Sequence, residues 1–284
     1  MRWGDGRKSD NVEDRRGIRV SRGMVGGGVG TLVLVLLSLY LGIDPTFLLN
    51  QAPPVTGPPA GTGREARPPE ENRLADFVSV VLADTEDTWK ELFRRSGETY
   101  REPTLVLFSD AAESACGFAD SAVGPFYCPK DRKIYIDLGF YRDLKDRFHA
   151  PGDFAQAYVI AHEVGHHVQN LLGISEKVQN ARARLGESEG NRLSVRLELQ
   201  ADCLAGVWAH HANRARNILE AGDVEEALGA ASAIGDDRLQ KQTRGFVVPD
   251  TFTHGTSEQR VRWFQAGIES GDMNRCNTFQ GAGG

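Results

Sequence analysis

Two short motifs decide how this chain of 284 residues is understood: HEVGH at 162–166 and ELQAD at 198–202. Histidines at i and i+4 lie one turn apart on the same face of a helix, so both imidazoles can reach one metal ion. Glu163 lies about 100° around that helix, where it can hydrogen-bond a metal-bound water without being a ligand. Glu198 offers a carboxylate from a second helix. The spacing therefore predicts a catalytic Zn²⁺ site with the ligands His162, His166 and Glu198 and an open fourth position.

The residue types of these motifs match the chemistry of peptide hydrolysis. Zinc lowers the pKa of its bound water to about 7 and polarises a carbonyl group. Glu163 is the predicted general base, which takes the proton from the attacking water and passes it to the leaving amine. A ligand histidine also needs its second ring nitrogen held by an acceptor, and Asp202, one turn beyond Glu198, is the candidate. The alternative for Glu198 and Asp202 is a solvated acidic pair on an exposed helix face.

Composition is that of a globular enzyme. Hydrophobic residues make up 40% of the chain and charged residues 25%, which leaves enough apolar material for a substantial core. The formal net charge is −6, and no stripe of basic and aromatic residues stands out. Nucleic acid is therefore excluded as an expected partner.

An apolar, uncharged segment at residues 23–43 is long enough to cross about 30 Å of hydrocarbon. Seven Lys and Arg residues precede it within residues 1–22, and no basic residue follows until Arg64. The positive-inside rule then predicts a single-pass protein of the cell membrane, with a cytoplasmic N-terminus and an extracytoplasmic catalytic domain. A cleaved signal peptide is the alternative, although no A-x-A-like site follows the apolar segment.

The expected fold class is α+β: an N-terminal transmembrane helix, then a zincin-like domain with a small antiparallel sheet and a helical active-site core. The predicted units are a cytoplasmic basic tail (1–22), a transmembrane helix (23–43), a Pro/Gly-rich linker (44–72) and a zinc metallopeptidase domain (73–284).

Within the last of these units, apolar periodicity predicts helices at 74–97, 152–172, 191–215, 224–235 and 257–270. Strands are expected at 104–108, 124–128 and 133–137. The turn sequence at 129–132 joins the last two strands into an antiparallel hairpin. Residues 133–137 are the expected edge strand, which would hold an extended substrate beside the metal helix.

The four cysteines lack the CxxC spacing of a structural zinc site. In an extracytoplasmic compartment an even number of cysteines favours disulfides. Cys116–Cys128 would close a short loop in the β region, and Cys203–Cys276 would join the Glu198 helix to the C-terminal segment. Buried free thiols are the alternative for both pairs.

Several motifs together resemble those of the bacterial family described as putative neutral zinc metallopeptidases. They are residues 157–170 (AYVIAHEVGHHVQN), 198–202 (ELQAD), 253–260 (THGTSEQR), 1–17 (MRWGDGRKSDNVEDRRG) and 124–129 (GPFYCP). The similarity runs from residue 1 to about Cys276 and leaves only the linker outside it. The resemblance implies a membrane-anchored zinc protein with a gluzincin-like core, acting on peptides or proteins.

A wider likeness concerns His254. In CAAX-processing and related membrane zinc proteases, a Thr-His-Pro segment follows the ExxxD helix and ends in an arginine. Here Thr253 and His254 are followed by Gly255 instead of proline, and Arg260 lies six residues beyond His254. The likeness implies that His254 donates a hydrogen bond to the oxyanion of the reaction. The alternative is that His254 caps the helix that begins near Ser257.

Two functions remain from the sequence. The first is a membrane-anchored zinc endopeptidase that hydrolyses peptide bonds, with the lipid bilayer contacted through its one N-terminal helix. The second is an inactive, zinc-containing extracytoplasmic binding protein that uses the same cleft to hold a partner. Glu163 favours the peptidase, because a binding protein has no need for a general base beside three metal ligands.

Overall fold

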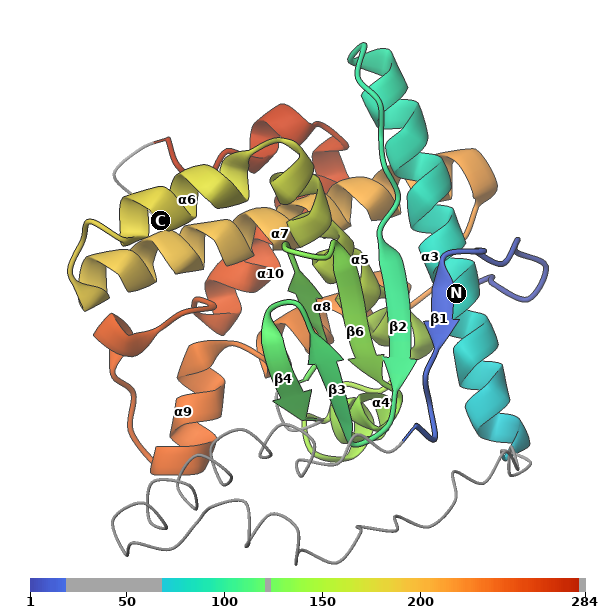
Figure 1. Ribbon diagram of the computed structural model, residues 1–284, viewed down its shortest axis with the longest axis horizontal. Coiled ribbons are helices and arrows are strands. Elements are labelled where there is room, and N and C mark those ends of the chain that lie inside the picture. Colours follow the sequence, from blue (N-terminus) through green and yellow to red (C-terminus); the bar gives the residue numbers. More distant parts are fainter. Residues whose placement is uncertain (19–67, 121–123, 281–284) are drawn as a thin grey trace, which may run out of the picture.

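The computed structural model describes residues 1–18, 68–120 and 124–280, and it places a small sheet against a layer of helices (Figure 1). The longer helices are α3 (Pro69–Arg95), α5 (Asp153–Leu171), α7 (Glu187–Arg216), α8 (Asp223–Ala233) and α10 (Ser257–Ser270). The shorter ones are α4 (Gly139–Asp146), α6 (Ile174–Arg182), α9 (Asp236–Arg244) and the 3₁₀ turns η2 (Pro249–Thr251) and η3 (Met273–Cys276). The strands are β1 (Val12–Asp14), β2 (Thr104–Phe108), β3 (Ala111–Ser114), β4 (Gly117–Asp120), β5 (Phe126–Cys128) and β6 (Lys133–Asp137).

The main sheet has the strand order β1-β2-β6-β5 and is mixed. β2 runs parallel to both β1 and β6, and only β5 and β6 form the predicted antiparallel hairpin. A purely antiparallel sheet was therefore the wrong expectation; β3 and β4 form a separate antiparallel pair. β6 lies between two strands, so the expected edge strand at 133–137 is also wrong. The edge is β5.

α5 begins and ends at glycines with positive φ. Gly152 has φ 121° and lies against the carboxylate of Glu226, and Gly173, where the sequence predicts the helix stop, has φ 70°. Between them most residues are buried and none is exposed, because α5 packs against α3, α6, α7, α8 and β5. Gly165, inside HEVGH, allows α5 to approach α7: a Cβ there would lie 2.9 Å from the carbonyl oxygen of Ala201. This close approach brings the two helices that carry the predicted metal ligands within reach of each other.

The N-terminal segment belongs to the same sheet as the rest of the domain. The three residues of β1 pair in parallel with β2, with Val12 opposite Leu105 and Asp14 opposite Leu107. In Figure 1, β1 runs alongside α3. The amino group of Met1 makes ion pairs with Asp153 and Asp223, more than 150 residues away. A chain that crossed a membrane once between residues 18 and 68 would leave β1 and β2 on opposite sides.

This pairing corrects the predicted fold class and localisation. The α+β core with a small sheet and a helical centre is present, but none of the helices in the described ranges is both long and apolar enough to span a bilayer. The transmembrane helix expected at 23–43 lies outside the described residues. The single-pass arrangement with a cytoplasmic N-terminus followed from the length of the apolar segment and the charge asymmetry around it. Neither feature indicates the pairing of β1 with β2.

Both predicted disulfides are present. Cys116 is bonded to Cys128, which joins the β3–β4 hairpin to the edge strand β5. Cys203 is bonded to Cys276, which joins the middle of α7 to η3 near the C-terminus. Because their Cα atoms are 5.8 and 5.4 Å apart, both pairs have ordinary disulfide geometry.

Candidate metal centre

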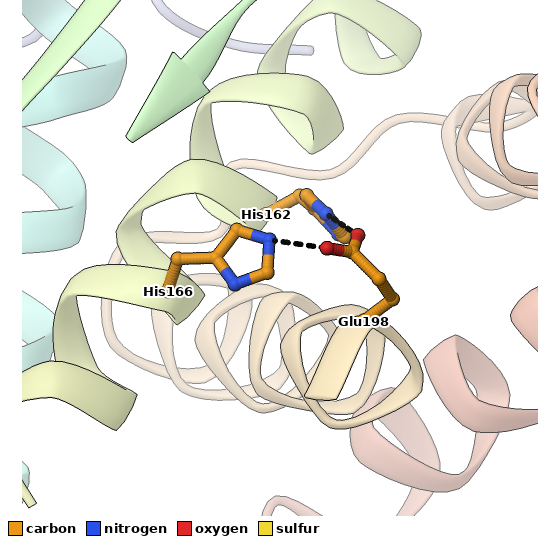
Figure 2. Close-up of side chains that lie close together, drawn as sticks. All are labelled: His162, His166 and Glu198. Atoms are coloured by element: carbon orange, nitrogen blue, oxygen red, sulfur yellow. Dashed lines mark hydrogen bonds and ion pairs between the residues drawn. The ribbon is translucent and has the colours of Figure 1, made fainter. Parts of the chain in front are cut away.

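The facing sides of α5 and α7 bring His162, His166 and Glu198 together (Figure 2). Nε2 of His162 lies 3.1 Å from one carboxylate oxygen of Glu198, and Nε2 of His166 lies 3.4 Å from the other. The two imidazoles stand nearly perpendicular, with ring centroids 4.8 Å apart. The two histidines thus present one nitrogen each, and Glu198 presents its carboxylate, to a common point.

These donor atoms fit a divalent zinc ion. Ligand atoms about 2.0–2.2 Å from a tetrahedral zinc are separated from each other by about 3.4 Å. The three donors all lie within 4.8 Å of one another, and the two measured nitrogen–oxygen separations are close to the tetrahedral value. Two neutral imidazoles and one carboxylate are also a donor set of catalytic rather than structural zinc sites. The chemistry and the geometry of the donors therefore agree.

His162 is held from behind by a buried charged network. Its Nδ1 lies 2.8 Å from Asp202, which also accepts hydrogen bonds from Tyr158 and from Nε and Nη2 of Arg260. Asp202 is fully buried and Arg260 is 2% exposed. Burial alone would raise the pKa of the Asp202 carboxyl, but Arg260 and His162 outweigh it and lower that pKa to about 2. Asp202 is therefore an acceptor for the proton on His162 Nδ1, which leaves Nε2 free for a metal.

The same network affects His162 directly. Burial opposes the charged form of His162, but the carboxylates of Asp202 and Glu198 outweigh it and raise the pKa of the imidazole to about 10. Carboxylates that attract a proton to Nε2 attract a divalent cation to the same place.

His166 is held differently. Its Nδ1 lies 2.9 Å from Oε1 of Gln169, one turn further along α5. The next histidine, His167, points away from the centre: its nitrogens contact the hydroxyl of Tyr127 and the carbonyl oxygen of Arg101. This agrees with the sequence position of His167, about 100° around the helix from His166.

A cleft with a volume of about 500 Å³ opens onto the three candidate ligands and also includes Glu163. Glu163 is 7% exposed and follows His162 directly on α5. Aromatic and aliphatic side chains line much of the remaining wall, among them Phe126, Phe140, Phe148, Val159 and Leu239. The cleft therefore offers a carboxylate beside the centre and an apolar surface further out.

His254 also lines this cleft and lies in the loop before α10. Asp236 accepts hydrogen bonds from the backbone NH groups of Thr253, His254 and Gly255, and its other oxygen lies 3.2 Å from His254 Nδ1. This hydrogen bond raises the pKa of His254. The alternative of a helix cap is wrong, because Thr256 is the N-cap of α10 and forms a capping box with Gln259.

Gly255 explains the departure from a Thr-His-Pro pattern. Its φ is 93°, a conformation that proline, fixed near −65°, cannot adopt. The glycine therefore belongs to the loop geometry that places the three NH groups around Asp236.

Sequence reasoning missed three residues behind the centre: Tyr158, Gln169 and Arg260. Arg260 was noticed as the end of the THG segment, but nothing in the local sequence showed that it would pair with Asp202, 58 positions earlier. Tyr158 lies one turn before His162, and Gln169 lies one turn after His166. Their positions on the metal face of α5 were the only available signal.

Comparisons with known proteins place the chain in a family whose description names zinc. The chain belongs to the family described as putative neutral zinc metallopeptidase, whose model matches residues 1–279. It is 52% identical over 292 residues to the uncharacterized protein YpfJ of Escherichia coli K12, covering 98% of this chain and 99% of that protein. It is 40% identical over 260 residues to the uncharacterized protein Rv2575 of Mycobacterium tuberculosis H37Rv, covering 86% of each. No solved structure matches the chain significantly.

Proposed function

We propose that the protein is a zinc peptidase that hydrolyses peptide bonds, with His162, His166 and Glu198 as ligands and Glu163 as general base. One observation carries the proposal: three ligand donors of the catalytic type converge in a cleft that also holds an acid which is not a ligand. The family description supports the same class of protein.

When bound, zinc supplies a Lewis acid and lowers the pKa of a coordinated water. The carboxylate of Glu163 accepts the proton of the attacking water and returns it to the nitrogen of the leaving amine. The hydrogen bond between Nδ1 and Asp236 raises the pKa of His254 and so favours its protonated form, which can donate from Nε2 to the developing oxyanion. Asp236 holds the imidazole by Nδ1, so Nε2 is the nitrogen left for that role.

The edge strand β5 is the proposed binding edge for an extended peptide. β6 occupies one side of β5, and among the described strands none pairs with its other side. Phe126 and Tyr127 of β5 line the same cleft as Glu163 and Glu198. A peptide added to this edge would use main-chain hydrogen bonds, which do not depend on its sequence.

Digestion of casein or a peptide library tests the proposal. The full chain is used because residues 1–18 form part of the fold. A chelator should abolish cleavage, and zinc should restore it. Glu163→Gln keeps the shape of the side chain but cannot accept a proton, so turnover should fall at least ~10²-fold while zinc content stays at the parent level.

Glu176→Gln on the exposed part of α6 is the matched control and should cleave like the parent. Unchanged turnover in Glu163→Gln would mean that another base acts. A parent chain that is folded and zinc-loaded but inactive would instead favour a protein that uses the cleft to bind a partner.

A further inference from the structure

A chain of amide hydrogen bonds leads away from His166 to the C-terminal part of the molecule. Gln169 on α5 accepts from His166 Nδ1, and its Nε2 donates to Oε1 of Gln200 on α7 at 3.1 Å. Nε2 of Gln200 donates in turn to the carbonyl oxygen of Cys276 at 2.9 Å. Gln169 is fully buried and Gln200 is 7% exposed, so water cannot readily replace these bonds.

The direction of this chain is fixed by backbone carbonyls. Gln169 Nε2 also lies 2.7 Å from the carbonyl oxygen of Leu197, which can only accept, so the NH₂ end of Gln169 must face that way. Its oxygen then faces His166, and Nδ1 of His166 must be the donor. In the same way the Cys276 carbonyl requires the NH₂ end of Gln200, which turns Oε1 of Gln200 toward Gln169. His166 is thereby held in the tautomer whose Nε2 has a free lone pair.

Two contacts hold the far end of this hydrogen-bond chain, at Cys276, against α7. Cys276 is bonded to Cys203 on α7, directly after Asp202. Two residues beyond Cys276, Thr278 donates a hydrogen bond to the carbonyl oxygen of Arg196, also on α7. Both contacts hold the segment around η3 against the helix that carries Glu198.

We propose that Gln169 and Gln200 are positioning residues for His166, and that the disulfide-anchored segment at Cys276 sets the metal affinity of the centre through them. The proposal rests on the zinc site proposed above. Outer hydrogen-bond partners of ligand histidines typically contribute 10–100-fold to metal affinity. Gln169 contacts the ligand itself, whereas Gln200 and the disulfide act through it, so the effects should decrease along the chain.

Zinc affinity of the full chain, measured by competition with a chromophoric chelator, tests this order. Gln169→Leu should weaken zinc binding by about 10–100-fold. Gln200→Leu and Cys276→Ser should each weaken it by a smaller factor. Asn170→Leu is the matched control: it removes the neighbouring amide of α5, whose partners are Tyr127 and Pro129, and should leave zinc affinity within about twofold of the parent.

A double variant distinguishes an effect passed along the hydrogen-bond chain from a general loss of order around the site. If Gln200 and Cys276 act in series, Gln200→Leu/Cys276→Ser should bind zinc no more weakly than the worse single variant. Additive losses would overturn the series. In the zinc-loaded parent, the Nδ1 proton of His166 should give a slowly exchanging NMR signal, and Gln169→Leu should lose that signal while remaining folded.

The two proposals fail in different ways. A parent chain that binds no zinc refutes the metal site itself. A parent that binds zinc, with Gln169→Leu equally tight or with its Nδ1 signal unchanged, refutes only the positioning role. If Gln169→Leu does not fold, Gln200→Leu against Asn170→Leu decides the question, and equal affinities in those two variants count against the proposal.

Discussion

His162 and His166 lie one turn apart on the same helix, yet their Nδ1 atoms are held by different kinds of partner, one charged and one neutral. Asp202 backs His162 with a full negative charge, and the guanidinium of Arg260 balances that charge. Gln169 backs His166 with a neutral amide that needs no counterion. A carboxylate makes an imidazole a stronger ligand, but a buried carboxylate is costly unless it is paired. One half of the centre therefore depends on charge balance and the other on hydrogen-bond geometry.

The largest expected effect comes from removing the counterion. Arg260→Met leaves Asp202 as a fully buried carboxylate that has lost its cation, so the free energy of unfolding should fall by about 3–5 kcal/mol. Denaturant titration measures it. Arg262→Met, on the exposed side of α10, should change stability by less than about 0.5 kcal/mol. Asp202→Asn combined with Arg260→Met should recover part of the loss. If Arg260→Met lowers the free energy of unfolding by less than about 1 kcal/mol, the ion pair of Arg260 with Asp202 is not what stabilises the side of the centre around His162.

His167 provides a third case, an imidazole buried against the neutral hydroxyl of Tyr127 and the carbonyl oxygen of Arg101, and it predicts a pH dependence. Burial lowers its pKa to about 4, whereas in the unfolded chain the pKa is about 6.5. Between these values the unfolded state binds more protons at this histidine. The contribution of His167 to the unfolding free energy is therefore complete above about pH 6.5 and falls as the pH drops toward 4. The loss should reach about 3 kcal/mol. With a chelator present, the difference in unfolding free energy between the parent and His167→Gln should become smaller as the pH falls from about 6.5 to 4. Parallel pH profiles would contradict the assignment.

The smallest expected effect tests the charge on Asp202 directly. Asp202→Asn keeps an acceptor for His162 Nδ1 but makes the backing of His162 neutral, like that of His166. Zinc affinity should fall by about 10–100-fold. Because the single variant leaves Arg260 without its counterion, the Asp202→Asn/Arg260→Met double variant is measured beside it. Parent-like affinity in both would mean that the charge behind His162 has no role in metal binding.

Much of the fold was predictable because it depends on local periodicity. The metal helix was expected at 152–172 and spans Asp153–Leu171, and the helix expected at 257–270 has those bounds in the structure. The hairpin of β5 and β6 follows from a four-residue turn. Short elements were missed: α4, α6 and α9 have only eight or nine residues, too few for a clear apolar period.

Pairing between distant segments was the main source of error. β1 has three residues, VED, with no strand pattern of its own, and it becomes a strand only because β2 offers it a free edge. The same limit explains the wrong edge strand. The sequence shows only the hairpin that β6 forms with β5. The parallel pairing with β2 places β6 inside the sheet, so residues 133–137 are not the expected edge strand.

By itself, the sequence determined which groups are the candidates for binding the metal and for acting as the base, because the i, i+4 spacing of two histidines on a helix fixes their relative positions. It also determined both disulfide pairs as candidates. Asp202 was a candidate acceptor from the sequence, but only the tertiary structure showed that it holds His162. The tertiary structure alone also showed that Arg260 and Gln200 join the two networks from other helices. The physical reason is that spacing along one helix is set by backbone geometry, whereas contacts between helices are set by packing, here through the close approach at Gly165.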